Sequence, residues 1–81
     1  MAAKQERDVE KKYSKADFVA KLRRLADDIE NGVQFEIQIA GERLYVPVRA
    51  VYNIEHERSG GEEEIEFQIK WVHKQSDAPV I

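Results

Sequence analysis

The sequence contains no cysteine, and it has only one methionine, one tryptophan and two prolines among its 81 residues. The absence of cysteine excludes disulfide bonds, a thiolate nucleophile and any metal site built on thiolates. A domain this small without covalent cross-links must depend on packing alone. No stretch approaches the ~18 apolar residues of a membrane-spanning helix, and the first residues lack the apolar core of a signal peptide. We therefore expect a cytoplasmic protein that does not enter membranes.

Composition predicts a single soluble domain with a small core. Hydrophobic residues make up 42% of the chain and charged residues 36%, which is typical of a globular domain with a very polar surface. The charges are segregated, because residues 1–24 carry eight Lys or Arg against four Asp or Glu, whereas residues 25–81 carry five against twelve. Such asymmetry bears on the choice of partner and not on the fold.

Residues 64–71 alternate strictly between polar and apolar side chains. This pattern predicts a half-buried strand with Ile65, Phe67, Ile69 and Trp71 on its core face, because successive side chains of a strand point to opposite sides. Residues 52–57 alternate in the same way.

A tight turn at Gly60-Gly61 would join these two strands in a hairpin. The register then places Tyr52 opposite Ile69, so the apolar faces agree. On the other face lie two like-charge pairs, Glu55 with Glu66 and Glu57 with Glu64. Each pair should destabilise the sheet by tenths of a kcal/mol.

An amphipathic helix is predicted between Ser14 and Gly32. Ser14 can accept a hydrogen bond at the helix N-terminus, with Asp17 in the reciprocal capping position. Gly32 can adopt the left-handed conformation that ends a helix. The apolar stripe between them recurs at helical spacing and consists of Phe18, Val19, Leu22, Leu25, Ala26 and Ile29.

A second hairpin is predicted from the alternation in residues 33–39 and 44–48. Gly41-Glu42 reads as a type II′ turn, which places Ile37 opposite Val46. The fold class that follows is α+β: a two-layer sandwich in which one N-terminal helix packs on a four-stranded antiparallel β-meander. We expect the domain to span residues 9–72, with a frayed terminus at 1–8 and a tail at 73–81. Whether residues 9–13 add a strand stays open.

This arrangement resembles the amphi-Trp domain family, which is named for an amphipathic stretch ending in tryptophan. The resemblance rests on a helix, a proline-containing strand, the motif Asn53-Ile54-Glu55-His56-Glu57, a glycine turn and the stretch from Glu64 to Trp71, and it covers about residues 9–71. It implies the fold and transfers no catalytic residue.

No residue set predicts a reaction or a cofactor. His56 and His73 are far apart and lack the ligand number of a zinc site, and open strands provide neither the cleft nor the desolvation that acid–base catalysis needs. The four glutamates of the hairpin could offer oxygens to a divalent cation, but flat sheets lack the wrapping loop that supplies most ligands. We expect no enzyme, no cofactor and no bound metal.

The like-charge pairs instead favour a small protein-interaction module with an acidic sheet face. Its partner would be a basic protein or a second copy of the chain in a homodimer. The candidate surface comprises Glu55, Glu57, Glu64, Glu66, Lys21, Arg23 and Arg24. An alternative is a divalent-cation-binding or nucleic-acid-associated accessory protein that uses the basic helix, although a pI of about 5.4 disfavours nucleic acid. Charges that merely prevent edge-to-edge sheet pairing explain the glutamates equally well.

Overall fold

The computed structural model describes residues 6–74, which form one helix and four strands. In chain order these are α1 (Lys15–Asn31), β1 (Phe35–Ile39), β2 (Glu42–Val46), β3 (Val51–Ser59) and β4 (Glu62–Lys70). The α+β class is confirmed, and residues 9–13 belong to neither helix nor strand. Residues 1–5 and 75–81, which include most of the expected frayed terminus and tail, lie outside the described residues.

Both predicted ends of the helix are confirmed. The Ser14 hydroxyl oxygen accepts a hydrogen bond from the backbone N–H of Asp17 at 3.1 Å. At the other end Gly32 has φ 65°, and its N–H donates to the carbonyl of Ile29 at 3.1 Å. Glycine adopts this left-handed conformation without the steric cost that a Cβ brings.

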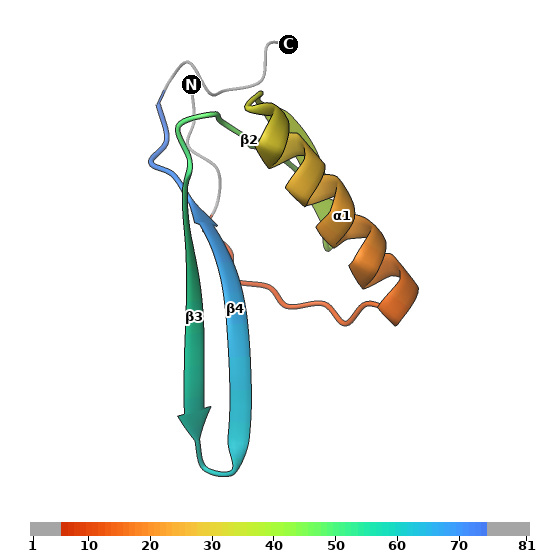
Figure 1. The fold of residues 1–81 in the computed structure, drawn as a ribbon, viewed down its shortest axis with the longest axis vertical. Coiled ribbons are helices and arrows are strands. Elements are labelled where there is room, and N and C mark those ends of the chain that lie inside the picture. Colours follow the sequence, from red (N-terminus) through yellow and green to blue (C-terminus); the bar gives the residue numbers. More distant parts are fainter. Residues whose placement is uncertain (1–5, 75–81) are drawn as a thin grey trace.

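The four strands form two separate hairpins, and the expected continuous meander is wrong. β1 pairs with β2 and β3 pairs with β4, all antiparallel, while β2 and β3 share no ladder. The cause lies between them, where Pro47 cannot donate a ladder hydrogen bond and the chain turns sharply. The N–H of Ala50 closes this turn on the carbonyl of Pro47 at 3.1 Å. The second hairpin therefore forms a sheet of its own and does not extend the sheet of the first hairpin (Figure 1).

The predicted register is confirmed in β3–β4, where Tyr52 lies opposite Ile69, and is wrong by two residues in β1–β2. Ile37 lies opposite Leu44, because the turn is formed by Ala40 and Gly41 with φ of 48° and 83°. Two consecutive positive φ angles are those of a type I′ turn, whose twist matches that of the flanking strands. A residue with a Cβ rarely takes the first position of such a turn. The sequence therefore predicted the turn one residue later than it occurs, at Gly41-Glu42.

Helix α1 lies over the β1–β2 hairpin (Figure 1), so the expected packing of the helix on all four strands is only partly found. Within the described part of the chain, the buried apolar residues are Val46 at 3% exposed, Ala50 at 6%, and Pro47 between them. Trp71 is half-buried. Ile54 and Phe67, which we expected in the core, are 67% and 65% exposed. Their hairpin is not part of the sheet that the helix covers.

Candidate interaction surface

The long β3–β4 hairpin carries the four glutamates of the candidate surface. Its strands have nine residues each, and every residue of β3 is exposed. It projects beyond the rest of the molecule toward the tip at Gly60-Gly61 (Figure 1). Both of its faces are therefore open for contact over much of their length.

One face is acidic, as the confirmed register requires. Glu55 lies opposite Glu66, and Glu57 lies opposite Glu64. Between the first two, the side-chain amide of Gln68 donates to Glu55 Oε2 at 3.1 Å and to Glu66 Oε2 at 2.8 Å. A neutral amide thus holds one like-charge pair together without neutralising it.

None of the four glutamates makes a salt bridge to another described residue, in 6–74. The pKa of Glu64 is raised from its ordinary value of 4.5 by a hydrogen bond shared with the Glu66 carboxyl, by repulsion from that group, by partial desolvation and by repulsion from Glu57 and Glu10. A nearby cation would relieve this repulsion. The acidic face therefore favours a positively charged neighbour.

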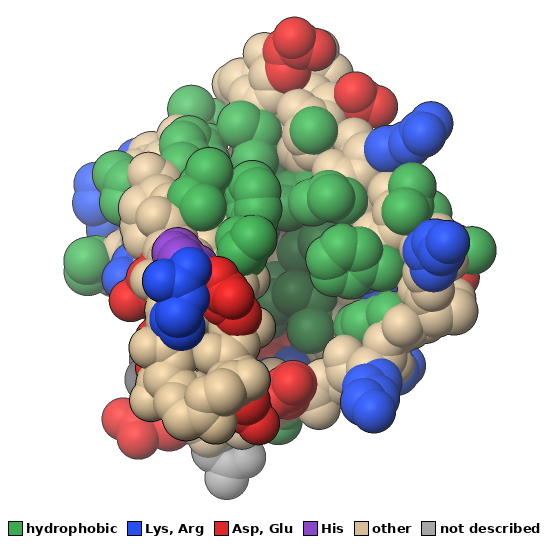
Figure 2. All heavy atoms as spheres, turned by 60° about the horizontal axis from the view of Figure 1, so that its bottom comes forward, with side chains coloured by type: hydrophobic (Ala, Val, Ile, Leu, Met, Phe, Trp, Pro, Cys, Tyr) green, Lys and Arg blue, Asp and Glu red, His purple; other side chains and the backbone are tan. Residues whose placement is uncertain are grey.

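The opposite face of the same hairpin is apolar and uncovered. Its side chains are Tyr52 at 52% exposed, Ile54 at 67%, Ile65 at 68% and Phe67 at 65%. The alternation predicted Ile65 and Phe67 on the core face, and the structure places them on the surface instead. Figure 2 shows apolar side chains gathered around a hollow between this hairpin and the helix.

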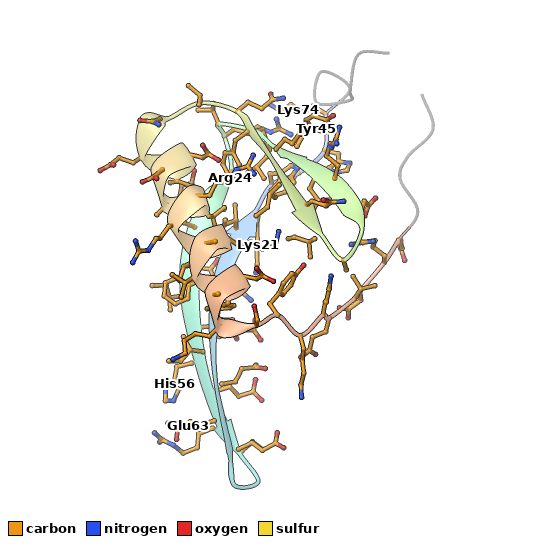
Figure 3. The ribbon with its side chains drawn as sticks, turned by 90° about the vertical axis from the view of Figure 1, so that its right-hand side faces the viewer. Lys21, Arg24, Tyr45, His56, Glu63 and Lys74 are labelled. Atoms are coloured by element: carbon orange, nitrogen blue, oxygen red, sulfur yellow. The ribbon has the colours of Figure 1, made fainter. Side chains whose placement is uncertain are left out.

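A charged cluster ends this apolar face near the hairpin tip (Figure 3). Glu63 Oε2 accepts from Arg58 Nη2 at 2.8 Å and lies 3.0 Å from His56 Nε2. Hydrogen bonds from Arg58 and then His56 lower the pKa of Glu63. Sequence reasoning missed this cluster, although the predicted register already placed Arg58 opposite Glu63.

The basic candidates of the helix do not meet the acidic face. Lys21 Nζ donates to the carbonyl of Gln38 at 2.8 Å and lies over the Tyr13 ring at 5.4 Å. Arg24 lies 4.0 Å from Asp28, while Arg23 contacts no charged partner in the described part of the chain. The seven candidate residues therefore form two surfaces, and the glutamates are the coherent one.

Three further findings concern residues 6–74 alone. No group of three His, Asp or Glu side chains is placed there to hold a metal ion. The helix in this range is not long and apolar enough to cross a membrane. A surface depression of about 510 Å³ is lined by Glu6, Arg7 and Asp8 and by none of the four glutamates.

A comparison with known protein families finds a match along almost the whole chain. The family described as Amphi-Trp domain matches residues 1–80, a wider range than residues 9–71, on which the resemblance was based. No curated protein and no solved structure matches the chain.

Proposed function

The chain belongs to the Amphi-Trp domain family, and we propose that it acts as a small non-catalytic protein-interaction module in the cytoplasm. The observation that carries the proposal is the acidic face of β3–β4. Four carboxylates lie together there without a cation from the rest of the described chain. Such an arrangement costs stability, and a basic partner recovers that cost on binding.

The chemistry of the face defines the partner. Open strands present carboxylate oxygens at a spacing that lysine and arginine side chains of a partner can reach. Electrostatic complementarity of this kind mainly sets the encounter rate and the specificity, and salt screens it. Binding should therefore weaken steeply as ionic strength rises.

A charge-matched pair of variants tests the proposal. The first converts the acidic face to amides, with Glu55→Gln, Glu57→Gln, Glu64→Gln and Glu66→Gln. The control removes the same number of charges elsewhere, with Glu6→Gln, Asp8→Asn, Asp27→Asn and Glu30→Gln. Binding of an oligolysine peptide is measured by titration at low and high salt, and proteins captured from a lysate are compared under the same conditions.

We expect the control to bind like the wild type and the face variant to lose at least tenfold in affinity, a difference of about 1.4 kcal/mol. Equal binding by both variants would show that only net charge matters, and the proposal would fail. If the face variant keeps every captured protein but aggregates, the glutamates serve to prevent edge-to-edge pairing of sheets.

A further inference from the structure

The described part of the chain buries few apolar side chains. Among the apolar residues in 6–74, only Val46, Pro47 and Ala50 are buried, and every residue of β3 is exposed. A two-stranded hairpin is only marginally stable when nothing covers it. Such a structure is expected of a subunit whose core is completed by another chain.

The missing part of the core can be located. Exposed apolar side chains line the hollow on both sides (Figure 2). They come from the hairpin and from the first half of the helix, and we call them the apolar hollow: Tyr52, Ile54, Ile65, Phe67, Phe18, Val19 and Leu22. At roughly 100 Å² of exposed surface each, about half of what an aromatic side chain can bury, they offer on the order of 700 Å² per copy. That area approaches one partner's share of a standard interface and exceeds the largest apolar patch of most monomers.

We propose that the apolar hollow is covered by a second copy of this chain, in a two-fold dimer in which the β3–β4 hairpin of each copy lies in the hollow of the other. The hollow has a hairpin on one side and a helix on the other, so each copy supplies both the inserted element and the receiving surface. This self-complementarity is what a two-fold interface requires.

The charges of the hairpin allow this insertion. Of the six acidic side chains in residues 51–70, only Glu63 shares the apolar face, where it is paired with Arg58 at 2.8 Å. The inserted face therefore brings a neutralised charge pair, not a net charge, against the partner. The four glutamates of the acidic face point away from the hollow and stay available to the partner proposed above.

The first test measures mass and stability against concentration. Sedimentation equilibrium of the full chain should give twice the monomer mass of 9.4 kDa, and the melting temperature should rise with protein concentration. Phe67→Ser should return the mass to that of one chain. Val48→Ser is the control, because Val48 is also exposed, at 60%, but belongs to the segment between β2 and β3 and to neither the long hairpin nor the helix.

The absence of cysteine permits a second test that does not depend on a variant remaining folded without its partner. Single cysteines are introduced as Ile54→Cys, Ile65→Cys, Phe67→Cys and, for control, Val48→Cys. Oxidation should give a covalent dimer for at least one of the three hollow positions and much less for the control. Crosslinking of all four to the same extent would indicate random collision and overturn the proposal.

The outcomes separate this inference from the proposed function. A wild type that stays at 9.4 kDa at every concentration overturns the dimer, and so does a dimer whose mass Phe67→Ser leaves unchanged. Neither result affects the acidic face, because its test compares glutamate variants with an oligolysine peptide. Conversely, loss of peptide binding by the face variant leaves the dimer mass unchanged.

Discussion

The two hairpins share one plan and differ in what covers them. Both close through two-residue turns with positive φ at each turn position. β1–β2 has strands of five residues and lies under the helix, whereas β3–β4 has strands of nine and lies open on both faces. The difference teaches that polar/apolar alternation identifies the apolar face of a hairpin but not the element that covers it.

The short hairpin is held by contacts from distant parts of the chain. Arg7 donates to the carbonyl of Ile39 at 2.9 Å and lies 2.7 Å from the Glu42 carboxylate, and the Tyr13 hydroxyl accepts from the Ala40 N–H at 3.2 Å. Among residues 6–74, the side-chain hydrogen bonds of the long hairpin stay within that hairpin, such as Gln68 with Glu55. A two-stranded hairpin alone is marginally stable in water, so the long hairpin needs another surface.

The largest expected effect comes from truncating one apolar side chain in each hairpin. Val46→Ala should lower the free energy of unfolding by about 2 kcal/mol, because it removes methyl groups from a buried site. Ile54→Ala should change it by less than about 0.5 kcal/mol in dilute protein, because that side chain is exposed. Urea unfolding followed by circular dichroism measures both. Equal losses in dilute protein would show that the two hairpins are equally buried.

Glycine and alanine can be exchanged at the first positions of the two turns, with opposite effects on stability. Gly60→Ala should cost about 1 kcal/mol, because Gly60 has φ 59° and no atom lies within 4 Å of an added Cβ, so the cost is conformational. Ala40→Gly should stabilise by about 0.5 kcal/mol, since Ala40 already bears that strain at φ 48°. Thermal unfolding of both variants checks the two signs. A stabilising Gly60→Ala would contradict the type I′ geometry.

Removing one distant contact should loosen only the short hairpin. Tyr13→Phe deletes the hydroxyl that accepts from the Ala40 N–H and should cost roughly 0.5 to 1 kcal/mol. Amide hydrogen exchange should accelerate in β1–β2 and stay unchanged in β3–β4. The same acceleration in both hairpins would mean that they unfold as one unit.

The smallest effects are pH-dependent and belong to the long hairpin. Glu64 has a raised pKa, so ionisation above that pKa disfavours the folded state, and stability should increase as the pH falls from it toward 4.5. Glu63 has a lowered pKa, so its stabilisation is present above 4.5 and is lost as the pH falls through the folded value. Melting temperatures are measured across this pH range. Glu64→Gln should abolish the rise in stability at falling pH, and Glu63→Gln should abolish the loss of stability at lower pH. If the pH dependence of the melting temperature is the same in both variants as in the wild type, neither carboxyl group has a pKa shifted by folding.

Local patterns in the sequence predicted the elements well, because they depend on neighbours along the chain. The helix caps at Ser14 and Gly32, the Gly60-Gly61 turn and the opposed glutamates all follow from short-range rules. The separation of the hairpins did not follow, since it depends on how the turn after Pro47 directs the chain. The exposure of Phe67 was missed because alternation is the same whether a face packs on its own helix or awaits another surface.

The amide of Gln68 has a consequence for how such sequences can vary. The amide nitrogen donates hydrogen bonds to two carboxylates at once. A glutamate at this position would have no N–H to donate and would add a third negative charge beside the two carboxylates. We therefore expect covariation in the family: chains with an acid at the position of Gln68 should carry lysine or arginine at the position of Glu55 or Glu66. Where the amide is kept, both glutamates can persist.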